Sequence, residues 1–156
     1  MNELNANGIN HNPAAFHVGL KVLLTNDKNE FLLLKAVSEN DEWHDSWDLP
    51  GGRINKDELG IGFHEIIDRE IKEEVGNIKY ELRPDPVSLA KCSYPRDNED
   101  RFFILFEARY LGGEITLCEE HSEYEWKKIT KDNVNKYFHK VFEELMDNYF
   151  KWNRHD

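Results

Sequence analysis

Two short apolar runs lie near the start of the chain, with turn-forming residues between them. The runs at 16–24 and 31–34 are rich in Leu, Val and Phe, and the segment 26–30 is composed of turn formers. This pattern predicts a β-hairpin. A polar stretch at 36–46 and the sequence Leu49-Pro50-Gly51-Gly52 follow. Proline and paired glycines disfavour regular structure, so a loop is predicted there.

The clearest helical pattern covers residues 63–75. Apolar residues recur at 63, 66, 67, 71 and 75, and Gly76 stands where a helix commonly ends. Beyond it, the runs 87–94 and 101–110 read as two strands. Gly112 and Gly113 then turn the chain into a further extended segment at 114–117, so a β-meander is predicted after the helix. The pattern ends with a strand at 124–129 and a terminal amphipathic helix at 134–152.

The predicted helix at 63–75 carries carboxylates on its apolar side. At 100° per residue, Glu70 and Glu74 fall inside the arc of apolar positions and Glu73 lies at its edge, whereas Arg69 falls on the opposite, polar side. Gathering carboxylates on adjacent turns and burying them is unfavourable unless a cation offsets the charge. A hard divalent metal with oxygen ligands, Mg²⁺ or alternatively Mn²⁺, would do so. The bland alternative is a charged surface helix in which Arg69 and Glu73 pair at i,i+4.

Composition narrows the class of protein. A chain of 156 residues corresponds to one domain, which we expect at 14–156 after a polar leader at 1–13 that can be flexible. The net charge of −11 argues against nucleic-acid and anionic-membrane partners. No apolar run approaches the roughly 18 residues of a membrane span, so a cytoplasmic location is expected. Cys92 and Cys118 are too far apart in sequence to indicate a zinc site or a disulfide framework.

The segment from Gly52 to Gly76 resembles the Nudix box, Gly-x5-Glu-x7-Arg-Glu-U-x-Glu-Glu-x-Gly-U, in which U is bulky and apolar. Glu58 matches its first glutamate, and residues 69–76 (REIKEEVG) match its core. The preceding residues 47–52 (WDLPGG) and the downstream segment 120–126 (EHSEYEW) are also similar to the family. Two departures stand out. Ten residues separate Glu58 from Arg69 where the family has seven, which indicates an insertion at 60–62, and Asn77 occupies the last apolar position.

The resemblance implies an α/β fold, namely an α/β/α sandwich with a mixed β-sheet. It also implies a metal-dependent pyrophosphohydrolase that cleaves a nucleoside diphosphate linked to another group and uses Mg²⁺, with Mn²⁺ as an alternative. The substrate is then a small nucleotide, and the protein a monomer or homodimer. Nucleoside triphosphates, nucleotide sugars, ADP-ribose and dinucleoside polyphosphates stay open as substrates. A Nudix-fold protein that binds a nucleotide or a partner without hydrolysis is the rival reading, and a Nudix-fold isomerase is a weaker one.

The same resemblance assigns roles residue by residue. The metal ligands it implies are the backbone carbonyl of Gly52 and the carboxylates of Glu70, Glu73, Glu74 and Glu120. Arg69 matches the arginine that orients the glutamates. Glu119 and Glu123 compete with Glu120 for the downstream position, and the general base stays open between Glu70 and Glu120.

Substrate-binding residues are harder to select from sequence. Arg53 follows the paired glycines and could reach a phosphate. Four aromatic residues could stack on a base or sugar, although such residues more often belong to the core: Trp43, Trp47, Tyr94 and Phe103. Three histidines, His44, His64 and His121, are not expected to bind metal.

Overall fold

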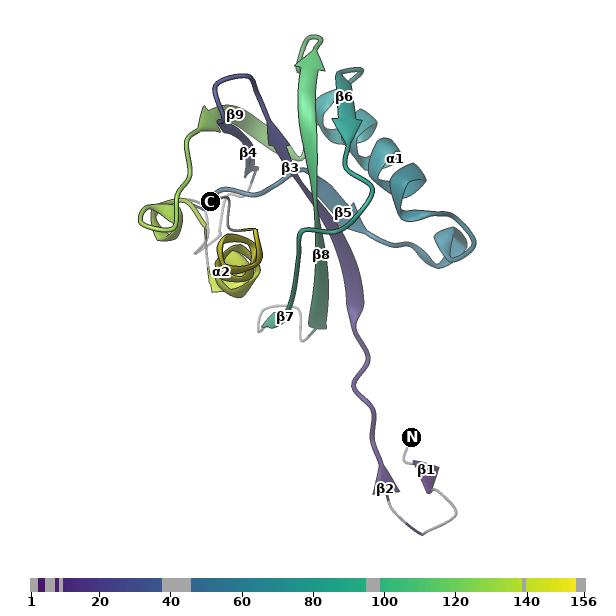
Figure 1. Cartoon of the computed structure of the whole chain (residues 1–156). Coiled ribbons are helices and arrows are strands. Elements are labelled where there is room, and N and C mark those ends of the chain that lie inside the picture. Colours follow the sequence, from purple (N-terminus) through teal and green to yellow (C-terminus); the bar gives the residue numbers. More distant parts are fainter. Residues whose placement is uncertain are drawn as a thin grey trace.

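A mixed β-sheet forms the centre of the protein (Figure 1). The computed structural model describes residues 3–4, 8, 10–37, 46–94, 99–138 and 140–153. Within these residues the sheet has seven strands, with the order β6-β8-β3-β4-β9, while β5 pairs with β3 and β7 with β8. Its strands are β3 (His17–Thr25), β4 (Phe31–Ala36), β5 (Gly51–Arg53), β6 (Lys79–Leu82), β7 (Ser88–Tyr94), β8 (Glu99–Gly112) and β9 (His121–Lys127).

One helix covers each face of the sheet (Figure 1). On one face α1 (Phe63–Val75) packs its isoleucines against alternate residues of β3, such as Leu20 and Val22. On the other face α2 (Glu143–Trp152) packs in a core that contains Leu23. Leu23 follows Val22 in β3 and therefore points to the opposite face of the sheet. The central strand is therefore mainly apolar on both faces, with Lys21 as its buried charged residue, and the predicted α/β/α sandwich with a mixed sheet is confirmed.

Several predicted elements are confirmed. The helix predicted at 63–75 is α1, with the same bounds. The hairpin of β3 and β4 and the antiparallel pairing of β7 with β8 also match, and β9 lies near the predicted last strand. The link at 95–98 lies outside the described residues.

Three predictions of local structure are wrong. Gly51–Arg53 forms the short strand β5 on the edge of β3, because glycine's lack of a side chain permits close strand pairing there. No strand forms at 114–117. Instead the strand β6 pairs with β8; its polar sequence KYEL gives no strand pattern. Because β8 also runs parallel to β3, the strands after the helix do not form a simple meander.

The predicted terminal helix at 134–152 is not continuous. Two 3₁₀ turns, η2 (Val134–Lys136) and η3 (Lys140–Phe142), precede α2, and residue 139 lies outside the description. Phe138, Phe142 and Leu145 are nevertheless buried as the spacing requires. Apolar spacing selects the residues that face the core, and short turns satisfy it as well as one long helix does.

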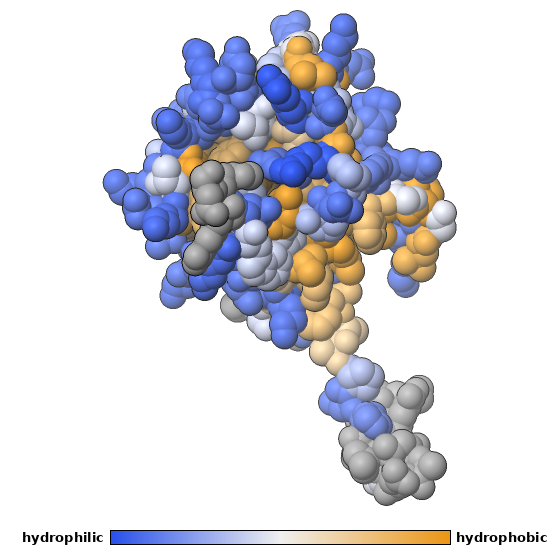
Figure 2. All heavy atoms as spheres, viewed as in Figure 1, coloured by the Kyte–Doolittle hydropathy of each residue, from blue (hydrophilic) through white to orange (hydrophobic). Residues whose placement is uncertain are grey.

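The polar start of the chain contains a small hairpin of β1 (Glu3–Leu4) and β2 (Asn10–His11) that stands away from the sheet (Figure 1). Hydrophilic residues cover most of the face seen in Figure 2. No helix in the described part of the chain combines the length and apolarity that a membrane span requires.

Candidate active site

The buried side of α1 carries two glutamates among its isoleucines, as the pattern predicted. Glu70 is 9% exposed and Glu74 is 7% exposed, in line with Ile66, Ile67 and Ile71. The side chain of Glu73, at the edge of this face, is 58% exposed. One side of α1 thus carries a row of carboxylates that extends from the protein interior, at Glu70 and Glu74, to the surface, at Glu73.

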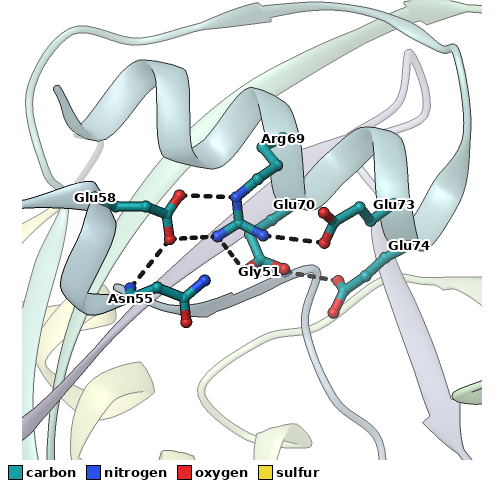
Figure 3. Close-up of polar contacts among 7 residues, drawn as sticks. All are labelled: Gly51, Asn55, Glu58, Arg69, Glu70, Glu73 and Glu74. Atoms are coloured by element: carbon teal, nitrogen blue, oxygen red, sulfur yellow. Dashed lines mark hydrogen bonds and ion pairs between the residues drawn. The ribbon is translucent and has the colours of Figure 1, made fainter. Parts of the chain in front are cut away.

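Arg69 is the centre of an ion-pair cluster (Figure 3). Its guanidinium makes a two-pronged pair with Glu58, in which Nε donates to Oε2 and Nη2 to Oε1, both at 2.8 Å. Nη2 also lies 2.9 Å from Glu70 Oε1, and Nη1 donates to Glu73 Oε2 at 3.0 Å. Sequence periodicity had placed Arg69 on the solvated side, whereas one arginine here connects three glutamates.

Glu58 occupies this cluster in spite of the insertion at 60–62. It lies in the 3₁₀ turn η1 (Lys56–Glu58), is buried, and accepts the backbone N–H of Asn55 at 3.0 Å. The hydrogen bonds from Arg69 hold the pKa of the Glu58 carboxyl below its usual value. The extra residues therefore extend the loop before α1 without displacing Glu58.

The paired glycines bring the backbone of β5 against these carboxylates. A Cβ atom on Gly52 would lie 2.4 Å from Oε1 of Glu70, so only glycine permits this approach. Gly51 donates its N–H to Oε2 of Glu74 at 2.8 Å. Gly51 has φ +134°, and a Cβ there would lie 1.9 Å from the carbonyl oxygen of Leu20. Gly51 is thus required by its backbone conformation and by the nearby backbone of β3, whereas Gly52 is required by the nearby side chain of Glu70.

Burial makes two carboxylates of this site costly to ionise. Desolvation raises the pKa of Glu74 to about 8, although Lys21 and the Gly51 N–H favour its charged form. Desolvation likewise raises the pKa of Glu70, against the opposing effect of Arg69. A divalent cation would compensate this buried charge, and oxygen-only donors suit Mg²⁺ or Mn²⁺.

The donor chemistry therefore fits a hard cation, although the side chains do not stand as a ready-made ligand set. Arg69 and the Gly51 N–H already engage oxygens of Glu70, Glu73 and Glu74. In the part of the chain that the structure covers, no three acidic, histidine or cysteine side chains converge as metal ligands. Binding a cation would thus exchange some of these contacts for metal–oxygen bonds.

A buried lysine also belongs to the site and was missed from the sequence. Lys21 of β3 donates from Nζ to Asp48 Oδ1 at 3.0 Å and to the carbonyl of Leu49 at 3.2 Å. Burial lowers the pKa of Lys21, but the carboxylates of Asp48, Glu74 and Glu70 outweigh it and leave that pKa above its usual value. A single lysine inside an apolar strand was the available signal.

A cleft of about 390 Å³ gathers these groups. Its lining includes Gly19, Lys21, Asp48, Gly51, Gly52, Arg53, Asn55, Glu70, Glu73, Glu74, Arg101, Phe103 and Glu120. Glu120 also lines an adjoining cavity with Glu119, whereas Glu123 pairs with Lys35 at 3.4 Å. Among the three downstream candidates, Glu120 is thus the one that faces the cleft.

The predicted substrate-binding residues are not all at this cleft. Arg53 lines it and lies 3.2 Å from Glu99. Trp47 packs against the α2-side core beneath Lys35, and it is not among the lining residues described. Tyr94 is the last residue of β7, and its side chain, like all of Trp43 and His44, lies outside the described residues.

The two described histidines from the sequence analysis lie elsewhere or are buried. His64 lies 3.2 Å from the carbonyl of Pro84, and a ring contact joins it to Phe106. His121 is buried 3.6 Å from the Cys118 sulfur, and desolvation lowers its pKa. A separate cavity of about 460 Å³ beside Thr25, Arg83 and Arg109 contains none of the predicted site residues.

Comparison with known proteins adds an independent result. A family model described as the NUDIX domain matches residues 15–146. Among solved structures, the MutT protein from Methanosarcina mazei Go1 is 28% identical, with a TM-score of 0.73 and coverage of 90% of this chain and 96% of that chain. A C. elegans Ap4A hydrolase is 18% identical, with a TM-score of 0.64 and coverage of 86% and 96%. A NUDIX hydrolase from Nitrosomonas europaea is 13% identical, with a TM-score of 0.66 and coverage of 90% and 93%. Curated protein sequences give no match.

Proposed function

This chain belongs to the Nudix family of hydrolases, which act on pyrophosphate bonds, and we propose that its own reaction is the divalent-metal-dependent cleavage of a nucleoside diphosphate linked to another group. The observation that carries the proposal is the burial of Glu70 and Glu74 beside the backbone of Gly51 and Gly52 in a polar cleft. Uncompensated buried carboxylates are unfavourable, and a bound cation is what would stabilise them.

We propose that the metal is held by Glu70, Glu73, Glu74, Glu120 and the carbonyl of Gly52. Mg²⁺ is the expected ion, with Mn²⁺ as an alternative. When bound, the ion neutralises phosphate charge and lowers the pKa of coordinated water. An acidic protein of net charge −11 needs such a cation before a polyanionic substrate can approach the cleft.

Arg69 has the role of positioning the glutamates. Its contacts with Glu58, Glu70 and Glu73 hold three carboxylates in a common arrangement. A planar guanidinium with five donors can bridge in this way, whereas an ammonium is a point charge. Glu58 is itself fixed by Asn55, so the cluster is tied to the loop before α1.

The proton acceptor is either Glu70 or Glu120. Glu70 lies deeper and pairs with Arg69, while Glu120 is exposed and lines the cleft. Both residues are proposed ligands, so Glu70→Gln and Glu120→Gln should each weaken metal binding. At saturating metal only the variant that lacks the base should lose the acidic limb of the pH profile of kcat/KM, and this distinguishes the two candidates.

For the substrate we propose a small nucleotide, with Arg53 contacting phosphate at the cleft. Trp47 and Tyr94 were expected to bind the base or sugar. The core position of Trp47 favours a supporting role under the 47–52 segment instead. Nucleoside triphosphates, nucleotide sugars, ADP-ribose and dinucleoside polyphosphates form the set to be tested.

The direct test is hydrolysis of these compounds with Mg²⁺ or Mn²⁺, with EDTA as the metal-free control. We expect release of a monophosphate product with at least one of them, and none with EDTA. Glu73→Gln and Glu74→Gln should each lose about 10²-fold or more in kcat. Glu65→Gln, on the exposed side of the same helix, is the matched control and should keep wild-type turnover.

Tight binding of a nucleotide without turnover would instead support the second candidate, a Nudix-fold protein that senses a nucleotide. The complete set of box glutamates argues against this candidate, because binding alone does not require several buried carboxylates.

A further inference from the structure

We propose that Lys21 is a positioning residue of this site: through Asp48 it holds the backbone at 48–52 in the place from which Gly51 and Gly52 contact the glutamates of α1. The inference rests on the proposed function, because it assigns Lys21 a task in presenting the metal-binding carboxylates. Lys21 lies outside the Nudix box.

Lys21 is an unusual residue for its position. It is 8% exposed, and its neighbours in β3, Leu20 and Val22, are completely buried. Burial of an ammonium group is costly unless hydrogen bonds and opposite charge compensate it. Here Asp48 and the carbonyl of Leu49 accept two of its donors, at 3.0 and 3.2 Å. The cost of burial is therefore offset within the cleft.

The contacts of Lys21 lead to the glutamates through the backbone. The same Asp48 oxygen accepts the N–H of Leu49 at 2.7 Å, so the carboxylate joins Lys21 to the backbone at 48–49. Two residues later, Gly51 pairs with Lys21 in the β3–β5 register and donates its N–H to Glu74 at 2.8 Å. Lys21 thus binds the start of the segment 48–52, at Asp48 and Leu49, while Gly51 in the same segment contacts Glu74 of α1.

Charge alone and positioning predict opposite results for a metal. If Lys21 acted only as a nearby positive charge, its removal would strengthen the binding of a divalent cation. If it positions the segment, its removal releases Asp48 and lets the Gly52 carbonyl, a proposed ligand, move away from its place beside Glu70, so binding weakens. Loss of a residue that supports metal ligands costs about 10- to 100-fold in metal affinity or activity.

The experiment measures Mn²⁺ binding by electron paramagnetic resonance, without nucleotide, in Lys21→Met, Asp48→Asn and the double variant. We expect Lys21→Met to bind Mn²⁺ about 10- to 100-fold more weakly. The double variant should bind no more weakly than Lys21→Met, because both changes break one contact. Lys21→Arg should recover part of the loss. Lys72→Met removes an equal charge from the exposed side of α1 and should bind as wild type does.

Each outcome decides a different claim. Unchanged or tighter Mn²⁺ binding by Lys21→Met, or additive losses in the double variant, would overturn the positioning role. If Lys21→Met does not fold, Asp48→Asn alone carries the test, since it must then weaken Mn²⁺ binding. A wild-type protein that binds Mn²⁺ but hydrolyses no nucleotide would defeat the proposed function and leave the positioning role measurable. A wild-type protein that binds no Mn²⁺ would defeat both.

Discussion

Alanine at Gly51 should reduce mainly the stability of the protein, whereas alanine at the adjacent Gly52 should reduce mainly its activity. Gly51→Ala places a Cβ 1.9 Å from the backbone oxygen of Leu20, in the central strand, at a φ of +134° that favours glycine. Because β3 cannot retreat without disturbing both core layers, we expect a loss of about 3 kcal/mol or more in unfolding free energy. For a chain of this size the melting temperature should fall by about 6–12 °C or more.

Gly52→Ala meets a different obstacle. Its Cβ would lie 2.4 Å from Oε1 of Glu70, and the carboxylate must move by at least about 0.6 Å to reach the 3.0 Å at which real contacts begin. A flexible side chain can make that movement and keep its ion pair with Arg69, so we expect a loss of unfolding free energy near the lower end of the cost of overpacking, about 1 kcal/mol. A displaced catalytic group, however, can cost about 10²-fold in rate.

Thermal unfolding and kcat/KM, measured on both variants, test this reasoning. Gly51→Ala should show mainly the fall in melting temperature given above. Gly52→Ala should melt within about 4 °C of wild type but lose about 10²-fold in kcat/KM. A Gly52→Ala enzyme with wild-type kcat/KM would refute the argument, because activity would then not depend on where Glu70 lies.

Two further predictions concern the charged groups. In the metal-free protein the pKa of Glu74 is raised to about 8, so the folded state holds this proton more tightly than the unfolded chain does. The stabilisation is fully present below the ordinary pKa near 4.5 and is lost as pH rises through about 8. Urea unfolding with EDTA should therefore show Glu74→Gln gaining stability relative to wild type between pH 5 and pH 8, and equal pH dependence of both proteins would contradict the assignment. Arg69→Lys should lower kcat/KM at least about tenfold, because an ammonium cannot bridge Glu58, Glu70 and Glu73 together. Lys72, which pairs with Asp68 on the exposed side of the same helix, provides the control: Lys72→Arg should leave kcat/KM unchanged.

Local periodicity was sufficient for the helix that carries the glutamates. Spacing of 3.6 residues per turn places Glu70 and Glu74 beside Ile67 and Ile71 whatever the rest of the fold does. The hairpin of β3 and β4 was equally predictable, since its strands are close in sequence and a turn joins them. Resemblance to the Nudix box supplied the family and the residue types of the site.

Long-range pairing decided what the sequence left open. Glu120 lines the cleft while Glu123 does not, because the β4–β9 register sets Glu123 opposite Lys35. The contact of Lys21 with Asp48 joins residues 27 positions apart, and no spacing rule predicts it.

By itself, the sequence determined which side chains share the buried side of α1, because neighbours along a helix are set by the chain's own geometry. Only the tertiary structure decided that β3 runs parallel to β8 and that β5 brings Gly51 and Gly52 to the glutamates. These contacts form between segments distant in sequence, where packing of the whole sheet, rather than local preference, selects the partner.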